Sequence, residues 1–380
     1  MSGSDTKATR PLHVVLMGGQ SDSLTIFRAP LIRALIARGH RVTTLAGRPD
    51  ATAIQKLTAM GAAHLTVPLD RTGGDPLADV WTLWRLTCAL RSLKPDVFLA
   101  YQIKPVTYGL IAAWAARVPR RIGMITGLGY AFVEEPGRRL ARALALIAYR
   151  LALPLARRVI FQNHDDIDLF TRAGLLRPGQ AVRVHGSGVD LQAFAPAPLP
   201  KGVPAFLLIA RLIRDKGVAD YVQAARIVRA RHPEARFRLV GPFDSNPARI
   251  EPATVEHWVE EGVIDYLGPL DDVRPAIAQA GIFVLPSYYR EGAPRTILEA
   301  MAMGRPVITT DVAGCRDTIV DGESGLLIPP RDPAALAQAM LRLIGAPDLA
   351  ARMGRSARLR AEALFDAETV SAAVIAEVEG

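Results

Sequence analysis

Residues 282–309 read IFVLPSYYREGAPRTILEAMAMGRPVIT. Two short runs rich in β-branched and apolar residues, at 282–285 and 306–309, flank a segment with the pattern of a helix. A strand, a helix and a second strand in this order are typical of a βαβ unit, whose strands lie parallel in one sheet. The stretch therefore predicts an α/β fold.

Similar runs occur in two series along the chain, separated by helical patterns. In the first series we expect strands at 12–17, 41–46, 63–67, 96–100, 121–125 and 158–162. In the second series we expect strands at 205–210, 236–240, 263–267, 282–285, 306–309 and 326–328. Each series predicts one doubly wound, Rossmann-like domain.

A proline-rich stretch separates the two series. Residues 195–204, APAPLPKGVP, contain four prolines, which lack the backbone amide that helices and sheets need. The stretch predicts a linker between domains at 1–194 and 205–364, since domains usually have roughly 100–200 residues. Residues 365–380 are expected to form a helix that packs back on the first domain.

Composition excludes several classes of protein. Half of the residues are apolar and 22% are charged, which is typical of a globular protein and not of a disordered or fibrous one. The two cysteines, Cys88 and Cys315, lie far apart and lack the spacing of zinc ligands, so they support neither a disulfide framework nor a structural zinc site. The first ten residues lack a secretory apolar run, and no membrane-spanning run follows. We expect a cytoplasmic protein that does not cross a membrane.

Charge is distributed unevenly along the chain. Residues 1–190 carry 25 lysines and arginines against 13 acids, a net charge of +12, whereas residues 191–380 carry 21 against 24, a net charge of −3. A basic half attracts nucleic acids, anionic membranes or phosphorylated substrates. Because no nucleic-acid-binding motif accompanies the charge, we expect no nucleic-acid partner.

Ligands of open α/β sheets bind at the carboxyl ends of strands, so the turns there are candidate sites. Gly18 and Gly19 follow the first strand, where glycines let a backbone approach an anion, although a simple tight turn is the alternative. Arg211 and Lys216 follow the run at 205–210, where two cations can neutralise a diphosphate. Ordinary surface cations are the alternative for this pair.

Two acids mark the strongest candidate site. Glu299 lies among apolar neighbours in the predicted helix. A carboxylate near a hydrophobic core usually has a bound partner. The two hydroxyls of a ribose would be a suitable partner for Glu299. Glu291 lies on the turn before that helix. An internal ion pair is the alternative for each acid, and the turn at 311–318 is expected to close one side of the cleft.

These residues resemble the C-terminal half of the retaining glycosyltransferases of family 4, which have the GT-B fold of two Rossmann-like domains facing a central cleft. The resemblance rests on Pro286-Ser287, Glu291-x7-Glu299, Gly304-x-Pro306-Val-Ile-Thr, Asp321-Gly322-x-x-Gly325 and Arg211-Leu-x-x-x-Lys216-Gly217. The N-terminal half is similar to a subgroup that elongates lipid-linked oligosaccharides for bacterial surface polysaccharides. That similarity rests on Phe27-Arg28-x-Pro30-Leu31, Pro95-Asp96-Val97, Ile103-Lys104-Pro105-Val106-x-Tyr108-Gly109 and Thr126-Gly-Leu-Gly-Tyr-Ala-Phe132.

The resemblance implies a nucleotide-sugar donor, UDP-linked in our interpretation, and a polyprenyl-diphosphate-linked saccharide acceptor. It implies Glu299 on the ribose, Glu291 on the donor sugar, and Arg211 and Lys216 on the diphosphate. Backbone amides at Gly19 and around Ala293, Pro294 and Arg295 would complete the diphosphate site, and Gly18 is expected to contact the substrate as well.

Catalysis would then be electrostatic, with no metal and no cofactor besides the donor co-substrate. The Asp166-Ile-Asp168 pair lies in a predicted helix with its two acids on different faces, so we interpret it as unrelated to metal binding. Many family members carry a histidine near the donor sugar. This chain has Thr126-Gly127-Leu128-Gly129 in that region, and no residue is assigned to that role.

The stretch 138–158, RRLARALALIAYRLALPLARR, combines arginines with apolar residues. On a helix, Arg139, Arg142 and Arg150 project within roughly one 80° sector. A basic amphipathic helix can lie at an anionic membrane surface, and we expect peripheral association at the inner face of the plasma membrane. The alternative is an ordinary helix with an arginine-rich solvent face.

Two other functions fit the same architecture. A nucleotide-sugar 2-epimerase would consume the donor without an acceptor, and a non-catalytic sensor would bind the donor without releasing a nucleoside diphosphate. The presence of both Glu291 and Glu299 argues against the sensor.

Overall fold

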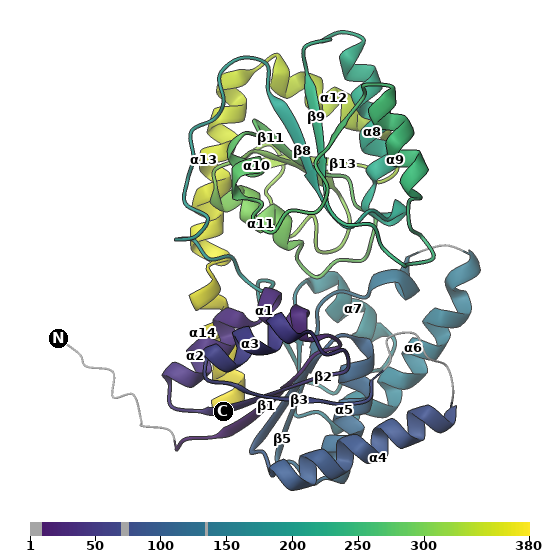
Figure 1. Ribbon diagram of the computed structural model, residues 1–380, viewed down its shortest axis with the longest axis vertical. Coiled ribbons are helices and arrows are strands. Elements are labelled where there is room, and N and C mark those ends of the chain that lie inside the picture. Colours follow the sequence, from purple (N-terminus) through teal and green to yellow (C-terminus); the bar gives the residue numbers. More distant parts are fainter. Residues whose placement is uncertain (1–9, 70–75, 134–135) are drawn as a thin grey trace, which may run out of the picture. The chain divides into compact units, whose positions relative to one another are not determined.

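The computed structural model describes residues 10–69, 76–133 and 136–380. Contacts within the chain group it into two compact α/β units (Figure 1). The first unit comprises the residues up to Thr126, Arg139–Ser187 and Glu368–Gly380. The second unit comprises Gly127–Arg138 and Gly188–Ala367.

The first unit contains a seven-stranded parallel sheet with the strand order β3-β2-β1-β4-β5-β6-β7. Its strands are β1 (His13–Met17), β2 (Arg41–Ala46), β3 (Ala63–Thr66), β4 (Val97–Tyr101), β5 (Arg120–Ile125), β6 (Arg158–Phe161) and β7 (Ala181–Arg183). Its α-helices are α1 (Ser21–Phe27), α2 (Ala29–Ala37), α3 (Ala51–Ala59), α4 (Pro76–Leu93), α5 (Ile103–Ala115), α6 (Arg139–Ala152), α7 (His164–Arg172) and α14 (Ala367–Glu379).

Helices cover both faces of this sheet (Figure 1). On one face, apolar side chains of α1, α2, α3 and α14 pack on alternate residues of the central strands, such as Val14 and Leu16. On the other face, α5 lies so close that a Cβ on its Gly109 would be 2.5 Å from the ring of Phe98. Helices α4 and α6 pack on either side of α5.

The C-terminal helix α14 belongs to the first unit. Val374, Ile375 and Val378 lie in the core of that unit. At the surface, Arg158 Nε donates to Glu377 Oε2 at 3.0 Å. The last helix of the chain is therefore part of the same body as its first strands.

The second unit contains a six-stranded parallel sheet with the order β10-β9-β8-β11-β12-β13. Its strands are β8 (Ala205–Ile209), β9 (Arg236–Val240), β10 (Asp265–Tyr266), β11 (Ile282–Leu285), β12 (Val307–Thr310) and β13 (Gly325–Ile328). Its α-helices are α8 (Val218–Arg229), α9 (Pro252–Glu260), α10 (Arg274–Ala278), α11 (Arg295–Ala302), α12 (Pro333–Ile344) and α13 (Pro347–Leu364). Helices α8, α9 and α12 pack on one face of the sheet, and α10 and α11 on the other. Helix α13 contributes Ala350 and Met353 to the apolar cluster with α8, α9 and α12, and Ala357 and Ala361 to the cluster with α10 and α11.

The α/β class is confirmed, and each strand expected from the sequence is present within a residue or two of its expected bounds. Strand β7 was not expected. It has three residues, Ala-Val-Arg, all only partly buried at the sheet edge, so no apolar run marks it.

The structure divides the chain differently from the sequence prediction. Gly127–Arg138 and Gly188–Phe194, which were expected in the first domain, belong to the second unit. The expected linker also packs on the second unit, because the buried Arg305 guanidinium donates to the carbonyls of Ala197 and Pro198. Prolines prevent helix and strand at 195–204 but do not prevent packing.

Candidate functional site

The second sheet reverses its strand order between β8 and β11, and such a switch point is where open α/β sheets bind ligands. Arg211 and Lys216 follow the carboxyl end of β8, whereas Ser287–Glu291 follows β11. The parallel pairing of these two strands brings both turns to the same edge of the sheet. The structure thus gathers the predicted cations and Glu291 within one unit.

Lys216 and Glu291 contact each other directly. Lys216 Nζ donates to Glu291 Oε1, and Ser287 Oγ donates to the same oxygen at 3.2 Å. The side chains of Lys216 and Glu291 are 13% and 12% exposed, so solvent screens the pair only weakly. An internal ion pair was the alternative expected for Glu291, and the structure contains that pair.

Arg211 also lies near Tyr289. Its Nη1 donates to Asp244 Oδ2 at 2.6 Å. The ring centroid of Tyr289 lies 6.0 Å from the guanidinium carbon of Arg211 and 5.3 Å from Lys216 Nζ. Both cations are therefore fixed around one aromatic ring, at distances where the ring face attracts positive charge.

Helix α11 carries Glu299 into a largely buried position. Its side chain is 8% exposed, and Arg295 Nε donates to Glu299 Oε1 at 2.7 Å across one helical turn. Burial raises the pKa of Glu299, and the Arg295 charge opposes that rise. Pro294 is the N-cap residue and has no N–H, so of the three residues expected to offer amides only Ala293 and Arg295 can donate one.

Residues 203–346 match the family described as glycosyl transferases group 1, and residues 27–188 match the glycosyl transferase 4-like domain. The chain belongs to the family 4 glycosyltransferases.

Two curated relatives illustrate the similarity. The N,N'-diacetylbacillosaminyl-diphospho-undecaprenol alpha-1,3-N-acetylgalactosaminyltransferase of Campylobacter jejuni is 27% identical over 349 residues, covering 88% of this chain and 90% of the relative. Glycogen synthase of Mycobacterium tuberculosis is 33% identical over 204 residues, covering 52% of this chain and 49% of the relative.

Solved structures share the fold. Alr3699/HepE of Anabaena, in complex with UDP and glucose, has a TM-score of 0.78 at 18% identity and covers 97% of this chain and 100% of its own. Sucrose-phosphate synthase of Thermosynechococcus elongatus has a TM-score of 0.77 at 21% identity and covers 96% of this chain and 98% of its own. The expected GT-B fold of this glycosyltransferase is confirmed.

The candidate site depends on glycines that allow close backbone approach. Gly217 has φ +73°, and a Cβ on it would overlap the carbonyl oxygen of Pro286. Gly314 has φ +81°, and a Cβ there would lie 2.5 Å from the carbonyl oxygen of Glu291. The loop that carries Glu291 is therefore packed against backbone at two places.

We expect Gly217→Ala to lower the free energy of unfolding by about 3 kcal/mol, from the left-handed backbone and the clash with Pro286 together. Gly262 has φ +68° and open space where a Cβ would stand, so Gly262→Ala isolates the backbone cost, about 1 kcal/mol. Urea unfolding followed by circular dichroism measures both. Equal losses in the two variants would show that the Pro286 contact contributes nothing.

Gly18 and Gly19 lie in the first unit, at the carboxyl end of β1. A Cβ on Gly18 would be 2.5 Å from Tyr101 Oη, so this position requires glycine. The amide of Gly19 donates to Gln102 Oε1 at 2.8 Å. A bend at Gly19 connects β1 to α1, and the substrate role of this pair stays a prediction.

Sequence reasoning missed Asp215, Asp244 and Arg138. Asp215 stands between two cations in the chain, and its carboxylate binds Arg138 at 2.7 and 3.0 Å. In the sequence, Arg138 directly precedes the other arginines of the basic stretch and is not distinguished from them. The only available signal was that Asp215 directly precedes Lys216. An acid next to a lysine is so common in sequences that this signal does not identify a functional residue.

Within the described part of the chain, no group of three or more histidines, cysteines or acids is placed to hold a metal ion. Asp166 lies buried in the first turn of α7, where Asn163 Nδ2 donates to its Oδ2 at 3.1 Å. Cys315 is also buried, which raises the pKa of its thiol to about 12.

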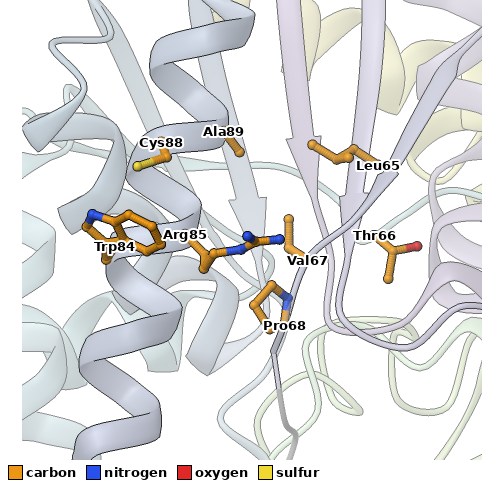
Figure 2. Close-up of a pocket in the computed structure, with 8 residues that line it drawn as sticks. All are labelled: Leu65, Thr66, Val67, Pro68, Trp84, Arg85, Cys88 and Ala89. Carbon is orange, nitrogen blue, oxygen red and sulfur yellow. The ribbon is translucent and has the colours of Figure 1, made fainter.

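A surface pocket of the first unit is separate from the site of the second unit. Figure 2 shows it between the edge strand β3 with the residues that follow it and helix α4, which contributes Trp84, Arg85 and Cys88. Its volume is about 200 Å³, and none of the predicted site residues lines it.

Proposed function

We propose that this glycosyltransferase transfers a sugar, with retention of anomeric configuration, from a UDP-linked sugar to a saccharide on a polyprenyl diphosphate or a related carrier in surface polysaccharide or glycoconjugate synthesis. The observation that carries the proposal is the arrangement of Arg211 and Lys216 around Tyr289 at the strand switch point, beside Glu291. The Campylobacter relative supports the acceptor class, since its name specifies a diphospho-undecaprenol acceptor and an alpha linkage.

Departure of a nucleoside diphosphate places negative charge on the oxygen that leaves the sugar. Lys216 and Arg211 are already held by Glu291 and Asp244, so they stabilise this charge without reorganising. In our proposal no metal is needed, because the two cations supply the charge. Glu291 binds hydroxyls of the donor sugar, Glu299 binds those of the ribose, and the amides at the start of α11 bind the diphosphate.

A donor screen tests this proposal. Nucleotide sugars that raise the melting temperature are offered with a membrane extract as the acceptor, and release of nucleoside diphosphate is measured. We expect release only with the extract, and an alpha-linked product by NMR. Donor consumption without an acceptor, with an epimerised sugar as the product, would support the 2-epimerase instead.

The acceptor class requires contact with a membrane, and helix α6 has a surface suited to it. Leu140, Leu144, Ile147 and Leu151 are 57–72% exposed and form one stripe along the helix. The buried residues Ala145, Tyr149 and Ala152 lie on the opposite side. Arg139, Arg142 and Arg150 are all exposed as well. None of the described helices is long and apolar enough to cross a bilayer.

The neighbouring helices also carry exposed aromatic side chains. Trp81 and Trp84 of α4 and Trp114 of α5 are at least half exposed, and α4, α5 and α6 pack in sequence within the first unit (Figure 1). Tryptophan is suited to the boundary between lipid and water. We propose that this face of the first unit lies on an anionic bilayer.

We expect Arg139→Gln, Arg142→Gln and Arg150→Gln together to weaken binding to anionic vesicles roughly 100-fold at low salt, at about 1 kcal/mol per arginine. Leu140→Ser, Leu144→Ser and Ile147→Ser should remove the binding that persists at high salt, because burial of apolar side chains is not screened. Cosedimentation with vesicles of graded anionic-lipid content measures both.

The matched control is Arg33→Gln, Arg172→Gln and Arg231→Gln, which removes the same charge from exposed positions outside α6. If the parent does not bind at low salt, or the control loses as much binding as the α6 arginine variant, the face is not a membrane surface.

A further inference from the structure

The loop that carries Glu291 is held by a segment that interrupts the first unit in the chain. Residues 127–138 belong to the second unit, although Thr126 before them and Arg139 after them belong to the first. Gly127–Val133 and Arg138 of this segment are called the bracing segment.

One end of the bracing segment binds the backbone next to Glu291. Gly127 and Glu291 form an antiparallel β-bridge. The amides of Leu128 and Gly129 donate to the carbonyl of Arg290 at 3.1 and 3.0 Å. These bonds fix the backbone immediately before and at the glutamate.

Glycine is required for this approach. Gly127 has φ +101°, and a Cβ on it would lie 2.5 Å from the amide nitrogen of Gly292. Gly129 has φ +64°, and a Cβ on it would lie 2.7 Å from Tyr289 Oη. A side chain at either position would push the bracing segment away from the loop.

Apolar residues anchor the middle of the bracing segment. Leu128, Phe132 and Val133 are 0%, 2% and 6% exposed. Burial of this extent stabilises the attachment of the bracing segment independently of its polar contacts. Loss of one polar contact is therefore not expected to release the whole segment.

The other end of the bracing segment binds the residue next to Lys216. Arg138 donates two hydrogen bonds to the carboxylate of Asp215, at 2.7 and 3.0 Å, and the two side chains are 4% and 1% exposed. The carbonyl of Asp215 accepts the amides of Tyr288 and Tyr289, both at 2.9 Å. Asp215 thus connects Arg138 to Lys216 by the chain and to the Tyr289 loop by hydrogen bonds.

A buried ion pair contributes little net stability, because desolvation of both charges offsets their attraction. Its geometry is nevertheless strict, since a bidentate guanidinium–carboxylate pair admits one arrangement. The Arg138–Asp215 pair is thus better suited to fixing a position than to stabilising the fold.

We propose that Arg138 is a positioning residue, which acts through Asp215 to hold Lys216 and the Tyr288–Glu291 loop in the geometry for catalysis. The proposal rests on the proposed function of Lys216 and Glu291. In the chain, the bracing segment follows Thr126 and precedes Arg139, which both belong to the first unit.

The test compares Arg138→Met, Arg138→Lys, Asp215→Asn and the exchange Arg138→Asp with Asp215→Arg. We expect Arg138→Met to lower kcat about 100-fold, the usual effect of displacing catalytic groups by about 1 Å, with the donor KM within about threefold of the parent. Arg138→Lys and the exchange should each recover part of kcat. Arg214→Ala, at the exposed neighbour of Asp215, is the control and should leave kcat unchanged.

A second measurement does not depend on turnover. Hydrogen exchange of peptides covering 286–292 should be at least tenfold faster in Arg138→Met than in the parent at a temperature where both are folded by circular dichroism. If Arg138→Met does not fold, Asp215→Asn, which keeps the volume of the side chain, serves in its place. Unchanged exchange in this loop, or a kcat equal to that of the parent in a folded variant, would overturn the proposal.

If the parent has no transferase activity but hydrogen exchange at 286–292 is faster in Arg138→Met, only the proposed function is contradicted. If the parent is an active transferase but hydrogen exchange at 286–292 is unchanged in Arg138→Met, only the positioning role of Arg138 is contradicted.

Discussion

Lys216→Met lowers kcat by about 100- to 1,000-fold while the donor KM changes by less than about tenfold, if Lys216 faces the leaving diphosphate. The charge on the leaving group grows as the bond to the sugar breaks, so a fixed cation stabilises the transition state more than the bound donor. Lys216 is suited to this because it is largely buried and held by Glu291. Methionine keeps an unbranched side chain of similar length and removes the charge together with the hydrogen bond to Glu291.

Steady-state kinetics with the donor identified in the screen measures this effect. Arg211→Met should show the same pattern with a smaller loss, because the Arg211 side chain is 36% exposed and its charge is better screened. Arg214→Met is the matched control, since Arg214 is an exposed cation on the same turn. We also expect activity to persist in the presence of a chelator.

A rise in KM at unchanged kcat in Lys216→Met would assign the lysine to donor binding alone. Loss of kcat in the Arg214→Met control would indicate that the turn as a whole was disturbed.

The fold was predictable because its strands are buried on both faces. A strand such as β11, Ile-Phe-Val-Leu, is fully buried and therefore consists of consecutive apolar residues, which a sequence displays directly. Strand β7 lies at a sheet edge and is only partly buried, so its composition does not distinguish it from a loop.

The candidate site was predictable where it follows from topology. Lys216 and Glu291 lie 75 residues apart, but both follow strands that a doubly wound sheet places side by side. The partners of these groups were not predictable, because a contact such as Arg138 with Asp215 depends on which segment packs on the loop. The apolar periodicity of a sequence does not predict which segment packs on a given loop.

The exposed apolar stripe of α6 is a second feature that the sequence does not settle. In the sequence, Leu140, Leu144, Ile147 and Leu151 have the spacing of a buried helix face. The structure instead buries the side of Ala145 and Tyr149 and leaves the leucine-rich side exposed. Apolar periodicity identifies two faces of a helix, and the choice of the covered face is made by tertiary packing.

Glu299→Ala is expected to weaken donor binding roughly 5- to 150-fold, since the loss of a buried hydrogen-bond acceptor costs about 1–3 kcal/mol. In our proposal the carboxylate accepts hydrogen bonds from the ribose hydroxyls. Arg295 donates to one carboxylate oxygen, Oε1, and the carboxylate keeps further lone pairs that can accept from the ribose. Isothermal titration calorimetry with UDP measures the effect without requiring an acceptor.

Glu299→Gln should retain part of the affinity, because an amide oxygen accepts a hydrogen bond but carries no charge. Glu323→Ala, at an exposed acid of the same unit, is the control and should bind UDP like the parent. Equal affinity of Glu299→Ala and the parent would contradict the ribose role.

The pH dependence provides an independent check on the same residue. Burial raises the pKa of Glu299, so protonation begins at a higher pH than for an exposed glutamate. Protonation replaces an acceptor by a donor, and UDP affinity should therefore fall as pH decreases through that raised pKa. In Glu299→Gln the side chain cannot titrate, so this part of the pH dependence should disappear. If the parent and Glu299→Gln lose affinity in parallel on acidification, another group is responsible, and Glu299 serves only as the partner of Arg295 in α11.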